Sequence, residues 1–327
     1  MKRIQAENTE LAPAGQTSCF DQHHAMCGCY TFDVRQLIVN ADDLGLTAGV
    51  NRAIRETHVS GVVSSATLMA AGAAFDDAIA LARSAPGLSV GCHVVLVDGT
   101  PVSDHGSIRT LLANRSAQPG RFYSRISAVA ARAVFGRLDR DQLVSEIVAQ
   151  VRKIQEAGVK VTHLDTHKHT HIFPQILAAM VKAAKICGVP AIRNPFVPAT
   201  ALGARQFAHT PGLWKRYGQV RILRSFAAQF HAKMKRAGLT TPDGVVGVIE
   251  TGSFDRSLLQ QALVNLPEGT WELVCHPGYD DDALRVTRTR LLASRDEERR
   301  LLTSPELRQS LDEHGIRVIS YREFADS

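Results

Sequence analysis

The chain has 327 residues, of which 45% are hydrophobic and 21% are charged, with a formal net charge of +6. This is enough apolar content to bury the core of one large α/β barrel or of two smaller domains. No run of 18 apolar residues occurs, which excludes a membrane-spanning helix. The N-terminus has acidic residues where a signal peptide has an apolar stretch, so we expect a cytoplasmic protein.

Strand-like and helix-like patterns alternate along the chain. Residues 1–34 are polar and lack a sustained period, which predicts a poorly ordered N-terminal extension. The patterns then predict strands over 36–40, 64–70, 88–96, 161–167, 191–195, 271–278 and 316–321, and helices over 48–60, 75–85, 126–135, 140–157, 174–187 and 294–315.

This alternation is typical of parallel strands joined by crossover helices. Because no linker-like composition divides the chain, we expect one (β/α)-barrel domain over 35–327 rather than two domains. Insertions are expected near 96–136 and 196–245, where the sequence is too polar or too irregular for the repeating unit.

Polar side chains follow the predicted strands at the point where each strand ends. They are Asp42, Asp43, His93, the stretch 163–167, Arg193 and His276. In (β/α) barrels the chemistry lies at the carboxyl ends of the strands, so this pattern predicts one shared site.

The densest cluster is HLDTHKHTHIF, residues 163–173, with four histidines and one aspartate. In a strand His163, Asp165, His167 and His169 share one face, and the β-branched threonines between them favour that geometry. Imidazoles and a carboxylate gathered on one face are the ligands of a divalent ion such as Zn²⁺ or Mn²⁺. The alternative is a polar turn that is rich in histidine.

The other strand-end residues allow two interpretations each. The pair Asp42 and Asp43 suits a metal ligand beside a general base, or a turn that Gly45 completes. His93 lies inside an apolar strand, where a hydrogen-bonded core histidine is the alternative to a ligand. His276 precedes a Pro-Gly turn and can donate a proton to a leaving group, act as a further metal ligand, or serve the structure alone.

Five motifs occur in the order LIVNADDLG, GCHVVL, THLDTHKHTHIFP, IRNP and CHPGY. In this order they resemble the YdjC-like carbohydrate deacetylases, over about 35–325. The resemblance implies a distorted, incomplete (β/α) barrel and the metal-dependent removal of an N-acetyl group from an amino sugar.

The resemblance also implies roles for individual residues. One divalent ion, Zn²⁺ or Mg²⁺, would be held by Asp43, His93 and His167. Asp42 would act as the base, His276 would protonate the departing amine, and Arg193 would orient Asp42. The remaining polar residues of the cluster would contact the substrate or support the ligands: His163, Asp165, His169 and His171.

The positive charge is concentrated in one segment. Between Asp165 and Asp243 there is no acidic residue and there are twelve Lys or Arg, so the remainder of the chain carries −6. Such a block indicates an anionic partner, either nucleic acid or an anionic bilayer. No recognised nucleic-acid-binding motif accompanies it, so we expect no nucleic-acid partner.

Within that segment, 219–237 has apolar residues at helical spacing with basic residues between them. This pattern is typical of a helix that lies on a membrane surface, and equally of a helix that packs its apolar stripe on the barrel. The overall sequence is similar to the hopanoid-biosynthesis-associated branch of the family. That similarity implies an N-acetylglucosaminyl hopanoid as substrate and peripheral membrane contact through 203–238. The alternatives are a soluble chito-oligosaccharide substrate, or a barrel that binds sugar or membrane without catalysis.

Overall fold

The computed structural model describes residues 35–113, 120–198, 226–248, 252 and 256–327, and these belong to one compact unit. The predicted N-terminal extension lies outside the described residues. In the described part of the chain, no helix has the length and the apolar character that a bilayer span requires.

The described strands form one sheet and are all parallel. They are β1 (Arg35–Leu44), β2 (Ser65–Leu68), β3 (Ser89–Val94), β4 (His163–Thr166), β5 (Ala191–Ile192), β6 (Gly244–Val246), β7 (Gly269–Cys275) and β8 (Ile316–Ile319). Their order is β5-β4-β3-β2-β1-β7-β6, and β8 pairs with the first half of β1. Because neighbouring strands run in the same direction, their carboxyl ends meet at one edge.

The two outer strands of this order, β5 and β6, approach each other without forming a ladder in the described residues. Isolated backbone hydrogen bonds join their surroundings: Ile192 N–H donates to Thr240 O at 3.0 Å, Thr240 N–H donates to Pro190 O at 2.9 Å, and Val245 N–H donates to Phe196 O at 2.9 Å. This confirms the predicted distorted, incomplete barrel.

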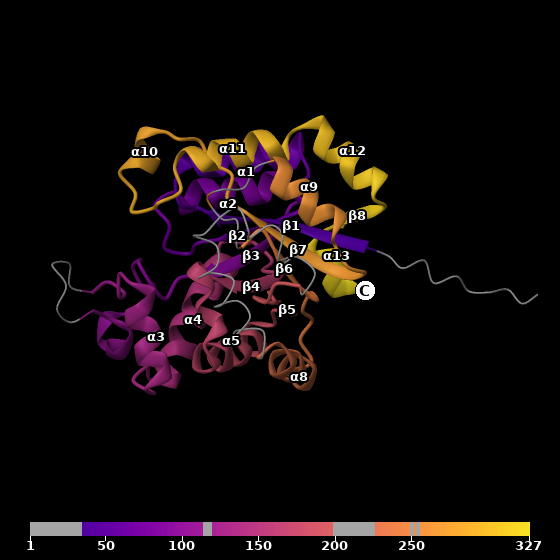
Figure 1. Ribbon diagram of the computed structural model, residues 1–327. Helices are drawn as coiled ribbons and strands as arrows, with labels where there is room; N and C mark the ends of the chain where they lie inside the picture. Colours follow the sequence, from indigo (N-terminus) through magenta and orange to yellow (C-terminus); the bar gives the residue numbers. More distant parts are fainter. Residues whose placement is uncertain (1–34, 114–119, 199–225, 249–251, 253–255) are drawn as a thin grey trace, which may run out of the picture. The chain divides into compact units, whose positions relative to one another are not determined.

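Most of the helices pack on the outer face of the sheet, and all but the last helix lie between strands in the chain (Figure 1). They are α1 (Ala48–Val59), α2 (Phe75–Ser84), α3 (Ile126–Val134), α4 (Arg140–Glu156), α5 (Pro174–Cys187), α8 (Ala227–Ala237), α9 (Arg256–Val264), α10 (Asp282–Arg285), α11 (Ala293–Leu302), α12 (Pro305–Glu313) and α13 (Tyr321–Asp326). Short 3-10 turns are η1 (His105–Ser107), η2 (Arg109–Leu111) and η3 (His167–Ile172).

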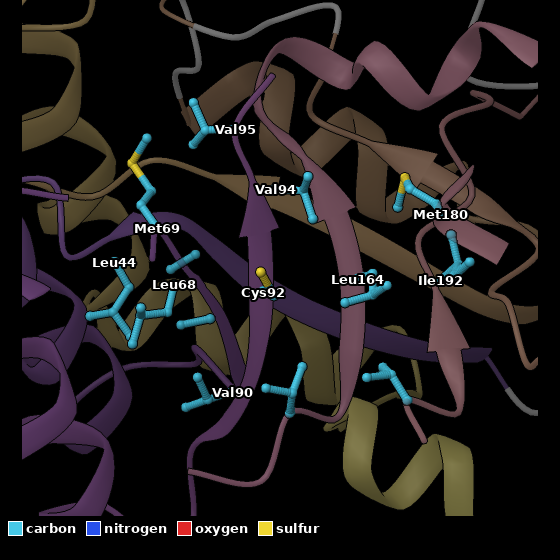
Figure 2. Close-up of a cluster of buried hydrophobic side chains, with 14 of the residues drawn as sticks. Leu44, Leu68, Met69, Val90, Cys92, Val94, Val95, Leu164, Met180 and Ile192 are labelled. Atoms are coloured by element: carbon cyan, nitrogen blue, oxygen red, sulfur yellow. The ribbon is translucent and has the colours of Figure 1, made fainter. Parts of the chain in front are cut away.

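Alternate residues of the strands face the helices and form the main core. Leu37, Val39 and Ala41 of β1 are fully buried in it, and Figure 2 shows the equivalent positions Cys92 on β3 and Leu164 on β4. Burial of each such side chain stabilises the fold by about 1.5–3 kcal/mol relative to exposure, so this outer layer holds the helices in place.

The other set of residues faces the barrel interior, and most of it is polar. Ile38 forms a small apolar floor with Ala191, Ile319 and Tyr321. Beyond this floor the buried inward residues are Asn40, Asp42, Thr67, His93, His163, Asp165, Arg193 and Glu272. Because an unpaired buried polar group costs about 1–3 kcal/mol, such an interior is stable only as a connected hydrogen-bond network.

Several local predictions differ from the structure, and the helix predicted over 294–315 is divided into α11 and α12. Strand β1 extends to Leu44, beyond the predicted end, and β6 was not predicted because three residues carry too little periodicity. The strand predicted over 161–167 ends at Thr166. Lys168 and His169 have φ of 56° and 52°, so the chain turns away into η3 and only His163 and Asp165 share a strand face.

Helix α8 covers part of the basic segment that was expected to face a membrane. Its apolar residues Phe230 and Met234 are 3% and 1% exposed and belong to the main core. In this part of the chain the stripe therefore packs on the barrel, as the alternative interpretation had it. Residues 199–225 lie outside the described residues.

Candidate active site

Three side-chain atoms converge at the carboxyl edge of the sheet. His93 Nε2 and His167 Nδ1 each lie 3.4 Å from Asp43 Oδ1, and the two nitrogens are 3.3 Å apart. The residues come from β3, from the start of η3 and from the end of β1. The sequence prediction had placed all three together.

These atoms have the arrangement that a divalent ion requires. For bonds of about 2.1 Å and tetrahedral angles, neighbouring ligand atoms lie about 3.4 Å apart. Among the described residues Asp43 Oδ1 is buried and has no hydrogen-bond partner, which is costly unless a cation faces it. The residues present therefore fit a divalent ion.

The support behind His93 points to the same conclusion. His93 Nδ1–H donates to Asp165 Oδ1 at 2.8 Å, which leaves the Nε2 lone pair directed at Asp43 and His167. Metal-binding histidines are commonly held by such a carboxylate. Burial alone would lower the pKa of His93, but Asp165 and Asp42 outweigh burial and raise the pKa to about 9, so the local field favours positive charge.

Asp43 reaches the site because β1 ends in an irregular turn. The pairing of β1 with β2 shifts register between Ala41 and Leu44, and Asp43 has a φ of 68°. A left-handed aspartate is strained by about 1–3 kcal/mol and persists only where its surroundings hold it. Arg295 on α11 does so, since its Nη2 donates to Asp43 Oδ2 at 2.5 Å. The positive charge of Arg295 outweighs burial and keeps the pKa of Asp43 well below its usual value.

Asp42 is held as an anion on the other side of the turn. Arg193 donates to both of its oxygens, at 2.7 and 2.9 Å, and Asn40 donates to Oδ1 at 3.0 Å. Burial would raise the pKa of Asp42, but the Arg193 guanidinium and then His93 outweigh it and hold the pKa far below its usual value. The bidentate pair also fixes the plane of the carboxylate.

Arg193 is the centre of the interior network. Besides Asp42 it pairs with Asp165 Oδ2 at 2.5 Å and with Glu272 Oε1 at 2.7 Å, and its side chain is fully buried. Tyr321 donates its hydroxyl to Glu272 Oε2 at 2.5 Å and connects the network to the floor of the barrel. One guanidinium thus faces three carboxyl groups. Burial raises the pKa of Glu272 to about 7, although Arg193 opposes that shift, whereas Arg193 helps to keep Asp42 ionised.

His276 lies at the end of β7, with its Nε2 3.8 Å from Asp42 Oδ2. Burial lowers the pKa of His276 to about 4, although Asp42 and Asp43 oppose that shift, so the free imidazole is neutral at pH 7. Glu298 on α11 accepts the main-chain N–H of His276 at 2.6 Å. Helix α11 therefore contacts both sides of the site, through Arg295 and through Glu298.

The remaining histidines of the cluster occupy different positions. His163 lies deep in the barrel, stacked on Tyr321 with ring centroids 3.6 Å apart, and its Nε2 is 3.1 Å from Asn40 Oδ1. His171 is buried, and its Nδ1 and Thr166 Oγ1 share a hydrogen bond of 2.7 Å. Of this group only His169 lines the cavity above the site, so His163 and His171 are placed to support the site rather than to touch a ligand.

A cavity of about 810 Å³ opens above the three converging atoms. Asp42, Asp43, His93, His167 and His276 form its floor, and its upper wall includes Arg121, Ile126, Lys168, Arg288 and Arg290. Small-molecule sites have volumes of about 300–1,000 Å³, so a ligand the size of a short oligosaccharide fits this space.

Sequence reasoning missed several residues of the site. Glu272 carried a signal, because a lone acidic residue inside an apolar strand is costly unless it is paired. Arg295 and Glu298 carried none, because they belong to a run of six charged residues, 295–300, in a helix whose inward face cannot be told from its charges. The sequence also gave no sign of the roles of Tyr321 and Asn40 in the site.

Comparison with known proteins agrees with this geometry. A family model described as YdjC-like protein matches residues 36–313. A carbohydrate deacetylase from Brevibacillus brevis is 31% identical over 297 residues, covering 88% of this chain and 99% of the relative. A chitooligosaccharide deacetylase from Escherichia fergusonii is 30% identical over 290 residues, covering 88% and 98%.

A solved structure shares the fold. It is a protein from Enterococcus faecalis V583, proposed to cleave cellobiose phosphate, with a TM-score of 0.70 and 23% identity over 89% of this chain and 98% of that chain. At this identity the likeness establishes the fold alone. From the family model, which spans most of the sequence, and from relatives at about 30% identity, the chain belongs to the YdjC-like protein family.

Proposed function

We propose that the protein is a metal-dependent carbohydrate N-deacetylase, which hydrolyses the acetamide of an N-acetylglucosamine unit to acetate and a free amine. The observation that carries the proposal is the triangle of Asp43 Oδ1, His93 Nε2 and His167 Nδ1 on the floor of a sugar-sized cavity, with Asp42 and His276 beside it. The names of the relatives at about 30% identity support the same reaction class.

Asp43, His93 and His167 would hold the divalent ion. Such an ion supplies Lewis acidity, which stabilises negative charge on a carbonyl oxygen and lowers the pKa of water. Asp165 holds the His93 ring and its tautomer, and Arg295 holds Asp43, so the ligand atoms stay aimed at one point in the absence of substrate.

Asp42 and His276 would move the proton. Hydrolysis forms a C–O bond from water and breaks the C–N bond, and the proton that water loses must reach the amine nitrogen. Asp42 is ionised and can accept that proton, and the neutral His276 is 3.8 Å away, within reach of a transfer when the groups close on substrate. Protonated His276 would then donate to the leaving nitrogen.

The finer proposal is that the sugar is carried by a lipid, as the N-acetylglucosaminyl hopanoid implied by the sequence resemblance would be. The basic and partly apolar upper wall of the cavity, with Arg121, Ile126 and Arg288, supports an amphipathic substrate. A soluble chito-oligosaccharide is the second candidate, and the similarity to the Escherichia fergusonii enzyme favours it.

Acetate release separates these candidates. The Zn²⁺-loaded protein should release acetate from an N-acetylglucosaminyl lipid in mixed micelles with a higher kcat/KM than from chitobiose. Turnover of chitobiose alone would reject the lipid substrate and keep the reaction class. Asp42→Asn should lose at least about a hundredfold in kcat on either substrate, since it removes the base. Full activity of Asp42→Asn would reject Asp42 as the base, and no acetate from any N-acetylated sugar would reject the reaction class.

A further inference from the structure

The cavity opens between two segments that both expose large apolar side chains, and we call these segments its lips. One lip is α3 with its flanking residues, 121–137, and the other is the turn at 286–291, and both contribute to the upper wall. The described residues include eight large apolar side chains that are exposed, and four of these lie on the lips. They are Ile126, Val134 and Phe135 on one side and Val286 on the other.

The apolar residues of the first lip form a stripe that begins at the cavity. Ile126, Ala130 and Val134 are spaced by four residues and therefore lie along one face of α3, which Phe135 extends. Ile126 lines the cavity and is 41% exposed, and Val134 and Phe135 are 72% and 71% exposed. Val129, which flanks this stripe, is buried and attaches the helix to the core.

Positive charge surrounds this stripe. From residue 120 to residue 138 there are four arginines and no acidic residue. The guanidinium carbon of Arg132 lies 4.6 Å from the ring centroid of Tyr123, and that of Arg137 lies 5.7 Å from the ring centroid of Phe135, so two of these charges lie directly against the aromatic side chains of the lip. Arg288, Arg290 and Lys168 add positive charge at the cavity, against Asp98.

We propose that these two lips form the surface on which the protein docks to an anionic lipid bilayer. At the boundary between headgroups and acyl chains, exposed aliphatic and aromatic side chains insert into the bilayer. The arginines around them bind the anionic headgroups. The cavity would then open toward the bilayer, so that a sugar on a lipid enters it without leaving the membrane. The role of this docking in catalysis rests on the proposed function, whereas the binding to the bilayer does not require catalysis.

The surface lies in a different part of the chain from the segment that the sequence had suggested. Phe230 and Met234 of α8 are buried, whereas Ile126 and Val134 of α3 are exposed and Ile126 lines the cavity. A stripe that begins at the entrance of the site gives docking a direct use in catalysis, which a stripe elsewhere on the barrel would not.

Vesicle sedimentation tests the proposal with the full chain. The protein should sediment with vesicles of phosphatidylcholine and phosphatidylglycerol in equal parts, and not with phosphatidylcholine alone, and added salt should release it. Phe135→Glu should weaken the partition about tenfold or more, and Arg125→Gln about fivefold. Val59→Glu is the matched control: Val59 is 70% exposed but ends α1 at the amino ends of the strands, so its partition should not change.

Three results would overturn the docking surface. The wild type could fail to sediment with anionic vesicles, or Val59→Glu could weaken the partition as much as Phe135→Glu. A lowered thermal unfolding temperature of Phe135→Glu would show that another segment of the chain covers α3. Both glutamate variants should keep the wild-type kcat/KM on chitobiose, because neither residue lines the cavity. Vesicle binding by a wild-type protein that releases no acetate would reject the proposed function but not the docking surface.

Discussion

Replacing Arg193 tests the interior network most severely. Arg193 is fully buried and pairs with Asp42, Asp165 and Glu272 at 2.5–2.9 Å. Breaking one buried ion pair by removing a partner costs about 3–5 kcal/mol, because the other charge stays buried and unpaired. Arg193→Met removes the guanidinium partner of the buried Asp42 and Asp165, so we expect the free energy of unfolding to fall by at least about 3–5 kcal/mol, a large part of a total of about 5–15 kcal/mol.

Urea unfolding at pH 7, measured after removal of metal ions, gives this free energy. Lys182→Met is the matched control, because Lys182 pairs with Asp141 at 3.3 Å while both side chains are exposed, so its loss should stay below about 1 kcal/mol. Arg193→Lys keeps one positive charge but lacks the planar guanidinium, so it should retain only part of the free energy that Arg193→Met loses. A loss for Arg193→Met no larger than that of the control would refute the role given to the network.

Three further predictions concern the metal and the helix behind it. Asp165→Asn removes the carboxylate that orients His93 and should weaken Zn²⁺ affinity about 10–100-fold, as measured by competition with a chromogenic chelator. Unchanged affinity would show that Asp165 does not support the metal ligands. Removing metal ions should lower the thermal unfolding temperature of the wild type but not of His93→Ala; an equal response of both would place the ion elsewhere. Burial raises the pKa of Glu298 from 4.5 to about 7, so between these pH values the folded chain keeps a proton that the unfolded chain releases, and the metal-free protein should lose stability as pH rises through that window. Burial also raises the pKa of Glu272 to about 7, so Glu298→Gln should reduce this loss without abolishing it in urea titrations at several pH values, and a slope unchanged in the variant would assign the whole loss to Glu272 or another group.

The positions of the candidate ligands could be predicted because parallel strands bring their carboxyl ends together. Asp43 and His93 are distant in sequence, yet each follows or ends an apolar strand, so the alternation of elements was enough to bring them to one edge. The choice between His163 and His167 could not be made in this way. This choice depends on the left-handed turn at Lys168 and His169, which a single sequence does not predict.

The support of the site was harder to predict than the site itself. Arg295 and Glu298 approach from a helix on the outer layer, and a charged residue on a surface helix is solvated in most proteins. Their roles follow from the packing of α11 against the ends of β1 and β7, which depends on tertiary contacts between distant segments. Likewise, the burial of Phe230 and Met234 in α8 is decided by packing, since the same spacing suits a membrane-facing helix.

The central claim is that one divalent ion is held by a carboxylate from β1 and by two imidazoles from the strands and turns beside it. A crystal of the Zn²⁺-soaked protein, with anomalous data collected on both sides of the zinc edge, tests this directly. We predict one strong peak within about 2.0–2.2 Å of Asp43 Oδ1, His93 Nε2 and His167 Nδ1. A peak bound by other residues, or a fully soaked crystal with no peak between these three atoms, would contradict the account.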